Sequence, residues 1–178
     1  MGQLNGSHTV GNGQYVIRRS SASVSAGGQP TWKDSMTITP DGIVRKHDHP
    51  AFNAYQPAAT SSGDIIICAA TRLNQGNHFS TTTGAFTAPV AGVYHFTFAI
   101  LVGASGSPDY HRILFEINAT GTNTTYGDNL EEQAGSQYSS AVMSITIYLN
   151  QNDYIRIRNQ GAATYGTSYG NFSGHLVG

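Results

Sequence analysis

The sequence predicts an all-β protein, a sandwich or jelly roll, and three observations carry that prediction. Apolar and polar residues alternate along several stretches, which is typical of strands with one buried face. Apolar residues at every third and fourth position, the mark of an amphipathic helix, are nearly absent. Turn residues such as Gly, Pro, Asn and Asp separate the alternating stretches, and many short strands with such turns favour a sandwich or jelly roll.

The composition agrees with this class and excludes several others. Charged residues make up only 11% of the 178 residues, and the formal net charge is −1. Such a chain offers no electrostatic attraction to nucleic acid or anionic lipid. No apolar run reaches the length of a membrane-spanning helix, and the N-terminus lacks the basic-then-apolar order of a secretory signal. We therefore expect folding in a cytoplasm, no nucleic-acid partner and no membrane insertion.

Residues 1–49 differ in character from residues 50–178. The first segment is net positive and thinly apolar, with strands predicted at Gln14–Arg18 and Ser35–Thr39 and a turn at Pro40–Gly42. So few apolar residues cannot bury a core of their own. We expect this segment to pack against other copies of the chain or a larger assembly, and the second segment to fold by itself.

The clearest strand of the second segment follows a turn that contains a proline. Tyr94, Phe96 and Phe98 point to one side of this strand, and His95 and Thr97 point to the other. Each aromatic ring buries on the order of 150–250 Å² when it enters a core. The three rings are therefore predicted to be core.

Further strands and turns follow the same logic. Residues 143–149 and 155–158 alternate between apolar and polar side chains, and turn residues cluster at 105–109 and 150–153. Cys68 is the only cysteine and lies within an apolar run. Because it cannot form an internal disulfide, it is predicted to be a buried structural thiol.

Motifs of known enzyme classes are missing from the sequence. It contains no Gly-x-Ser-x-Gly, no His-Glu-x-x-His and no phosphate-binding Gly-rich loop. Glu131 and Glu132 are adjacent, so on a strand they would point to opposite faces, and a solvated loop is the favoured interpretation. We expect no catalytic activity.

A family resemblance accounts for the aromatic strand. The spacing of seven positions resembles the aromatic motif of the C1q-like domain: Asn74, Phe79, Phe86, Gly92, Tyr94, Phe96 and Phe98. Residues 50–54 and 171–176 resemble the opening and closing strands of that domain. Residues 149–155 resemble its Leu-x-x-Gly-Asp-x-Val turn, with Asn152 in place of Gly. The first aromatic position of the motif falls on Cys68, so packing at that end must differ.

The resemblance implies a homotrimeric jelly roll of the type that C1q-like and tumour necrosis factor-like domains share. In that arrangement the core motif consists of Phe79, Phe86, Gly92, Tyr94, Phe96 and Phe98. The opposite side of the same sheet would contact the other two protomers, through His95, Thr97, Val142 and Ser144. The partner that the resemblance implies is therefore the chain itself.

The first segment adds a second, weaker resemblance. Residues 36–44, followed by Pro50–Phe52, resemble the stem segments that precede C1q-like heads in bacteriophage fibre proteins. This implies a virion protein, made in the host cytoplasm, whose residues 1–49 contact other virion proteins. A tail-fibre tip that adheres to the host and a capsid fibre or decoration protein are both open. The alternative is a secreted or surface-exposed C1q/TNF-like ligand or matrix protein.

Tyrosines between the predicted strands are the candidates for recognition of a host surface glycan or protein. Tyrosine gives a large contact area at a low cost in conformational entropy, and loops on a rigid scaffold commonly carry recognition. Ordinary inter-strand loops are an equally open interpretation. The candidate binding loops carry Tyr110, Tyr126, Tyr138, Tyr165 and Tyr169.

Two histidines between the segments are candidate metal ligands. His47 and His49 are two residues apart, so on an extended chain both imidazoles would point to the same side. Pro50 favours extended geometry in the residue before it. Three chains around a threefold axis would then offer six imidazoles to a divalent transition metal such as iron or nickel. The alternative is a solvated, charged linker.

Overall fold

The structure is a computed structural model of the whole chain. It describes residues 8–11, 13–20, 23, 27–103, 110–120, 122–132, 138–166 and 168–178. Among these it gives no side-chain description for residues 8–11, 119–120 and 122–132. The turn predicted at 105–109 lies outside the described residues.

Every regular element in the described ranges is a β-strand, so the predicted all-β class is confirmed. The chain divides into two compact units, an N-terminal unit of residues Met1–His49 and a head unit of residues Pro50–Gly178. The N-terminal unit contains β1 (His8–Gly11), β2 (Gln14–Ser20), β3 (Trp32–Ile38) and β4 (Val44–Lys46). The head unit contains β5 (Ala51–Pro57), β6 (Ile65–Ile66), β7 (Cys68–Gln75), β8 (Phe86–Thr87), β9 (Gly92–Val102), β10 (Tyr110–Thr120), β11 (Thr122–Glu132), β12 (Ser139–Leu149), β13 (Tyr154–Asn159) and β14 (Gly170–Leu176).

The N-terminal unit is one antiparallel sheet in the order β1-β2-β3-β4. Strand β2 continues the predicted Gln14–Arg18 to Ser20, and β3 begins earlier than the predicted Ser35–Thr39 and ends at Ile38. Strands β1 and β4 are added to them. Among its described side chains only Val16 and Thr37 are buried. Ion pairs join exposed side chains of this unit. Arg19 and Lys33 both pair with Asp48, at 2.7 and 3.0 Å, and the hydrogen bond from Arg19 is the main reason why the pKa of Asp48 is lowered.

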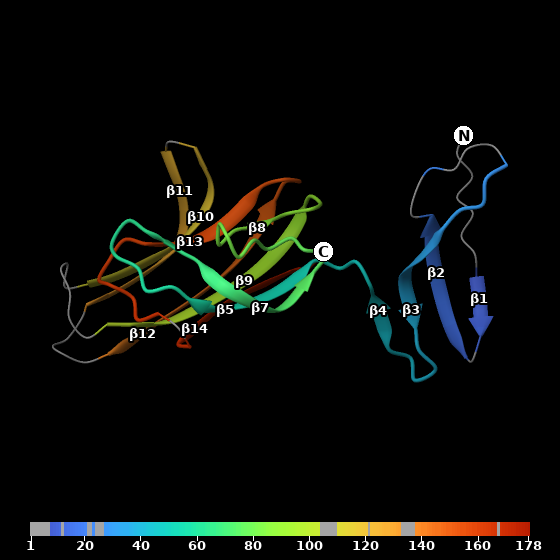
Figure 1. Cartoon of the computed structure of the whole chain (residues 1–178), viewed down its shortest axis with the longest axis horizontal. Coiled ribbons are helices and arrows are strands. Elements are labelled where there is room, and N and C mark those ends of the chain that lie inside the picture. Colours follow the sequence, from blue (N-terminus) through green and yellow to red (C-terminus); the bar gives the residue numbers. More distant parts are fainter. Residues whose placement is uncertain are drawn as a thin grey trace. The chain divides into compact units, whose positions relative to one another are not determined.

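The head unit consists of two five-stranded sheets of the jelly-roll kind (Figure 1). One sheet, which we call the assembly sheet, has the order β12-β9-β14-β5-β7. The other has the order β11-β10-β13-β6, and β8 also pairs with β13. Strand β9 lies inside the assembly sheet between β12 and β14, antiparallel to both. It therefore places one row of side chains against the opposite sheet and the other row on the outer face.

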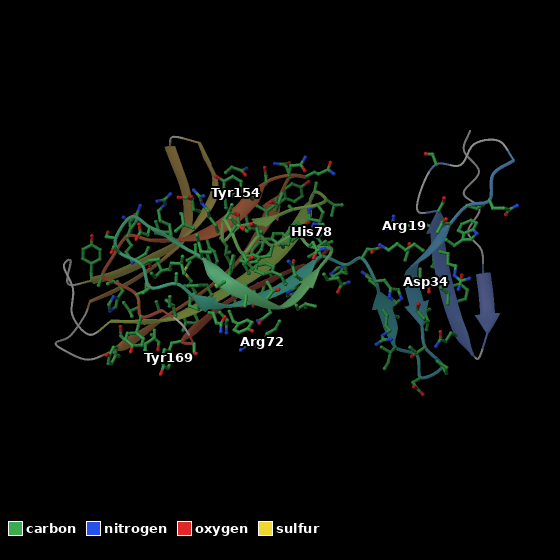
Figure 2. All side chains as sticks on the ribbon, in the orientation of Figure 1. Arg19, Asp34, Arg72, His78, Tyr154 and Tyr169 are labelled. Atoms are coloured by element: carbon green, nitrogen blue, oxygen red, sulfur yellow. The ribbon has the colours of Figure 1, made fainter. Side chains whose placement is uncertain are left out.

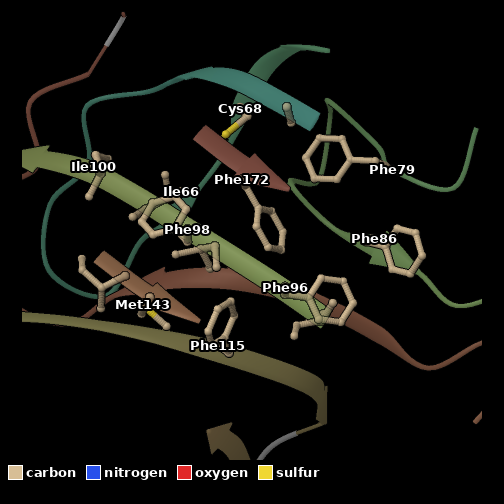
Figure 3. Packing of buried hydrophobic residues seen from close by; sticks show 14 of the residues in the cluster. Ile66, Cys68, Phe79, Phe86, Phe96, Phe98, Ile100, Phe115, Met143 and Phe172 are labelled. Atoms are coloured by element: carbon tan, nitrogen blue, oxygen red, sulfur yellow. The ribbon is translucent and has the colours of Figure 1, made fainter. Parts of the chain in front are cut away.

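The core lies between the two sheets and is rich in aromatic rings (Figure 3). Burial alternates strictly along β9, so that Tyr94, Phe96 and Phe98 face inward, as the alternation predicts. All six residues of the core motif are buried. Phe52 and Phe172 join them, and their rings meet edge to face at 4.9 Å between centroids. Stacked and edge-to-face contacts of this kind add to the stabilisation that burial gives.

The lone cysteine is confirmed as a buried thiol. Cys68 is free and has 1% of its surface exposed. Burial raises the pKa of this thiol to about 12, although a backbone hydrogen bond with Phe172 acts in the opposite direction. A thiol that stays protonated at neutral pH is a poor nucleophile.

The turn between β12 and β13 shows why Asn152 can stand where the C1q-like pattern has glycine. Asn152 has a φ of 71°, in the left-handed region that favours Gly and tolerates Asn. Asp153 fixes the turn, since its carboxylate accepts a hydrogen bond from the Asn150 backbone at 2.7 Å. Asn152 therefore adopts a backbone conformation that glycine also favours.

Candidate functional site

The outer face of the assembly sheet carries rows of hydroxyl and imidazole side chains. Thr97 on β9 lies directly opposite Ser144 on β12 and Ser173 on β14. The hydroxyls of Thr97 and Ser173 are 2.8 Å apart and hydrogen-bonded. In the next row His95 lies opposite Thr146, and its Nδ1 is 2.9 Å from the threonine hydroxyl. Hydroxyl and imidazole groups thus occupy the middle of this face.

Apolar side chains stand exposed on the same face. Val142 and Tyr148, on β12, expose 63% and 59% of their surfaces, and Leu73, on β7, exposes 46%. Val142 and Ser144 alternate with buried residues along β12, which places both on the outer face. Exposed apolar side chains concentrated on one face mark a surface that is commonly covered by a partner.

A cluster of three tyrosines, here called the tyrosine cluster, lies at one end of this sheet. The ring of Tyr165 meets that of Tyr138 edge to face at 5.4 Å and that of Tyr169 at 5.6 Å. The three side chains expose 58% (Tyr138), 45% (Tyr165) and 54% (Tyr169) of their surfaces. The cluster therefore presents aromatic surface and phenol hydroxyls to solvent.

The sheet register explains why these three meet. Tyr138 immediately precedes β12 and Tyr169 immediately precedes β14, and both strands pair with the same end of β9, near Ile100 and Val102. The segment between β13 and β14 is held to that end of β9, because the Tyr165 N–H donates to the Leu101 carbonyl at 2.9 Å. Leu101 N–H in turn donates to the Tyr169 carbonyl, also at 2.9 Å.

Two hollows flank the tyrosine cluster. The first, of about 530 Å³, is mostly apolar and is lined by Pro57, Ala58, Ala59 and Tyr165 among others. Its shape depends on Gly166, because any side chain there would collide with the Ala59 backbone. This hollow could accept a compact apolar group beside the exposed rings.

The second hollow, of about 400 Å³, opens on the outer face of the assembly sheet. Its lining includes Arg72, Val142, Tyr169 and Asn171. Figure 2 shows Arg72 and Tyr169 on the same side of the head unit. The Arg72 guanidinium lies 4.0 Å from the centroid of the Tyr55 ring, a cation–π contact. Tyr169 thus belongs both to the tyrosine cluster and to the outer face of the assembly sheet.

Two of the five candidate tyrosines do not lie in loops. Tyr110 is the first residue of β10 and exposes 39% of its surface. Tyr126 lies within β11, opposite Phe115 on β10, and its side chain is outside the described residues. The loop interpretation was wrong for both, and also for Glu131 and Glu132, because β11 extends to Glu132. Strand pairing with β10 extends further than the polar sequence of this region indicates.

The two candidate metal ligands do not lie on an extended segment. His47 and Asp48 form a turn directly after β4, and the His49 N–H donates to the Lys46 carbonyl at 3.4 Å. The imidazole Nε2 of His47 is 2.8 Å from the hydroxyl of Thr37, to which it is hydrogen-bonded. The extended geometry that the metal hypothesis assumed is therefore corrected to a turn.

Sequence reasoning missed a buried carboxylate in the second sheet. Glu116 on β10 has no exposed surface, and its carboxylate accepts hydrogen bonds from Arg156 and Arg158 on β13. Burial would raise the pKa of Glu116, but the two guanidinium groups outweigh burial and hold that pKa below its usual value. Both carboxylate oxygens of Glu116 are hydrogen-bonded, so this residue stabilises the fold and is not a free acid or base.

Metal-binding clusters and membrane-spanning helices are both missing from the described part of the chain. No group of three or more His, Cys, Asp and Glu side chains lies close enough together there to hold a metal ion. No described helix has the length and apolar character needed to cross a membrane.

Comparisons with known proteins assign the head unit to a protein family. The family model of the C1q domain matches residues 51–177. The A chain of the complement C1q subcomponent of Bos taurus is 32% identical over 60 residues, which are 34% of this chain and 25% of that protein. Caprin-2 of Danio rerio is 30% identical over 132 residues, which are 71% of this chain and 14% of that protein. The chain thus spans a quarter or less of the length of these relatives.

Solved structures give the same fold at low sequence identity. The globular domain of zebrafish complement 1qA is 18% identical, with a TM-score of 0.51, over 72% of this chain and 98% of that one. The Eiger TNF of S. frugiperda is 11% identical, with a TM-score of 0.60, over 74% and 94%. Murine APRIL is 17% identical, with a TM-score of 0.56, over 72% and 98%.

Proposed function

Because the chain belongs to the C1q domain family through residues 51–177, we propose that it is a homotrimeric recognition module of a bacteriophage particle. Domains of the C1q and TNF type typically form homotrimers and are generally ligand or structural domains without enzymatic activity. In this role the assembly sheet mediates contact between copies, the tyrosine cluster binds the host surface, and a bacteriophage particle carries the trimer.

The exposed apolar face of the assembly sheet is the observation that carries the proposal. Val142, Tyr148 and Leu73 would each leave about half of their surface or more in water if the head unit stayed a monomer. Burying apolar surface contributes about 25 cal/mol per Å². The polar members of the middle of this face include hydroxyls that already bond to each other, such as Thr97 with Ser173. Covering the middle of this face with other copies therefore removes apolar surface from water while Thr97 and Ser173 keep their hydrogen bond.

The tyrosine cluster and the apolar hollow beside it support a recognition role. Tyr138 and Tyr165 present rings whose faces can stack on the C–H groups of a sugar or on apolar side chains, while their hydroxyls donate or accept hydrogen bonds. The loop is anchored to β9 by backbone hydrogen bonds, so little order has to be gained on binding. A host surface glycan or protein is the class of partner that this surface fits.

The N-terminal unit supports attachment to a larger particle. Its described side chains bury almost nothing apolar, while Trp32, Ile43 and Val44 expose 40%, 60% and 54% of their surfaces. These side chains lie on or beside β3 and β4 and are available to other virion proteins. A tail-fibre tip and a capsid decoration protein, each made in the host cytoplasm, are the two placements within this proposal.

A second candidate function is a secreted or surface-exposed ligand or matrix protein. The observation that favours it is the kind of relative found, since the bovine complement C1q protein and the TNF-type structures are animal proteins. The two candidates share the trimer and the tyrosine cluster. They differ in whether the chain is a component of a virus particle.

Proteomic analysis of purified particles tests the proposal. Phage particles induced from the genome that carries the gene, banded by density and digested, should yield peptides of this chain in constant ratio to the capsid protein. Peptides recovered only from the particle-free medium would overturn the phage placement and support the secreted ligand. In both cases the recombinant chain should have a mass of about 57 kDa, three times 18.9 kDa.

A further inference from the structure

Two histidines lie side by side on the outer face of the assembly sheet. His95 on β9 and His175 on β14 are direct partners in the antiparallel register. Their ring centroids are 5.8 Å apart, and the planes are inclined by 58°. Directly opposed residues of an antiparallel pair project to the same face, so both imidazoles reach toward the same volume above the sheet.

Thr146 fixes the orientation of one of these rings. Its hydroxyl lies 2.9 Å from Nδ1 of His95. In the tautomer that donates from Nδ1, the lone pair is on Nε2, at the far side of the ring from the threonine. Metal-binding histidines commonly donate the other ring N–H in this way, which fixes the tautomer and the direction of the ligand.

The surroundings of the pair suit a cation. The rings border a hollow of about 310 Å³, whose lining also includes Leu73, Thr97 and Ser173. None of the residues that line it is a lysine or arginine, so no positive side chain of the lining competes with a metal. His175 is exposed, which leaves a path for an ion to enter.

We propose that His95 and His175 bind one divalent transition metal ion per protomer, of the class of Zn²⁺, Ni²⁺ or Cu²⁺. A metal about 2.0–2.1 Å from each Nε2 would place the two ring centroids up to roughly 6 Å apart, and 5.8 Å falls within that limit. Imidazole nitrogen is a preferred ligand of these ions. Water, or a donor from a neighbouring copy, completes the coordination.

Metal binding does not require the proposed trimer, because both ligands come from one protomer. The trimer matters only for the effect of the metal on stability. If the assembly sheet is covered by other copies, the metal lies at the contact between them, and loading it should raise the thermal stability of the trimer through linkage.

Equilibrium dialysis of the tag-free, chelator-treated full chain against Zn²⁺, followed by elemental analysis, tests the site. We expect about one Zn²⁺ per chain. His175→Ala should weaken binding on the order of tenfold or more, because one of two protein ligands is lost, and Thr146→Val should weaken it less, as removal of a positioning residue. The double variant His47→Ala with His49→Ala is the matched control and should keep the full stoichiometry.

Three outcomes would overturn the proposal. One is no bound Zn²⁺ or Ni²⁺ in folded wild-type chain, and another is binding that His175→Ala leaves unchanged. The third is a stoichiometry of one metal per three chains that is lost in the double variant, which would assign the metal to His47 and His49. Native mass spectrometry of the same samples reports the oligomeric state separately, so failure of the metal site and failure of the trimer are distinguished.

Discussion

Gly174 and Phe96 face each other across β14 and β9, and the ring of Phe96 occupies the space that a side chain at position 174 would need. The ring of Phe52 also borders this space, with its Cε1 2.9 Å from the position of a Cβ. Both rings are buried. The glycine of the closing strand therefore allows β14 to lie directly against the aromatic core.

We expect Gly174→Ala to destabilise the head unit by roughly 1–3 kcal/mol, the usual cost of forcing an extra group into a packed core. Chemical denaturation followed by tyrosine fluorescence measures the difference. Gly178→Ala is the control, because nothing lies within 4 Å of a Cβ at that position. Equal stability of the two variants would show that the core rings can move aside at no cost.

The carboxylate of Glu116 predicts an acid-sensitive sheet. Its pKa is lower in the folded chain than the ordinary 4.5, since hydrogen bonds from Arg158 and Arg156 outweigh the effect of burial. A depressed pKa means that the stabilisation is complete above the unfolded pKa and is lost as pH falls through the folded pKa. The free energy of unfolding should therefore fall as the pH is lowered through and below 4.5, the ordinary pKa of the group.

The matching variant is Glu116→Gln, which leaves two guanidinium groups beside a neutral side chain. We expect a loss of about 3 kcal/mol at pH 7, as for other broken buried ion pairs, and a weaker dependence of stability on acid pH. Asp41→Asn, at an exposed turn position, is the control and should change neither quantity. An unaltered acid profile in Glu116→Gln would mean that other carboxylates govern the acid transition.

Features that follow from local pattern could be predicted from the sequence. The alternation in residues 94–98 correctly indicates which rings of β9 are buried, and the turn at 150–153 lies where its residue types predict it. Both depend on neighbours within a few residues. Strict alternation leaves only one register in which a strand can bury its apolar side.

Features that depend on long-range pairing could not be predicted in this way. Glu116 carries a charge that is typical of an exposed strand residue, and it is buried because two arginines about forty residues later lie beside it. The tyrosine cluster joins Tyr138 to Tyr165 and Tyr169 only because β12 and β14 flank one end of β9. Conversely, the polar sequence around residues 110 and 126 indicates loops, whereas both residues lie on paired strands, β10 and β11.

Substitution at Thr97 tests the assembly face. We expect Thr97→Arg to prevent trimer formation, because each copy would bury a guanidinium without a partner at the contact. Native mass spectrometry should then show the 18.9 kDa monomer instead of about 57 kDa. Thr87→Arg places the same side chain at an exposed position of β8, in the other sheet, and should leave the trimer intact. A wild-type chain that is monomeric at micromolar concentration would contradict the assembly itself.

Substitution at Tyr165 tests recognition, because this ring contacts both other members of the tyrosine cluster and lines the apolar hollow. Tyr165→Ala should lower binding of the trimer to its host surface glycan or protein by about tenfold, the lower range for a central aromatic contact. Tyr169 is less suitable, since it also lines the hollow on the assembly sheet and its loss could disturb the trimer.

Binding of labelled chain to whole host cells and to a glycan array measures the effect of Tyr165→Ala, and native mass spectrometry confirms that the variant is still trimeric. Tyr154→Ala, on β13 in the opposite sheet, is the matched control and should bind like the wild type. Tyr165→Phe separates the two contributions of the side chain, because it keeps the ring and removes the hydroxyl. If Tyr165→Ala binds as well as the wild type, recognition lies elsewhere on the chain, and a wild-type trimer that binds no host surface would favour the decoration role.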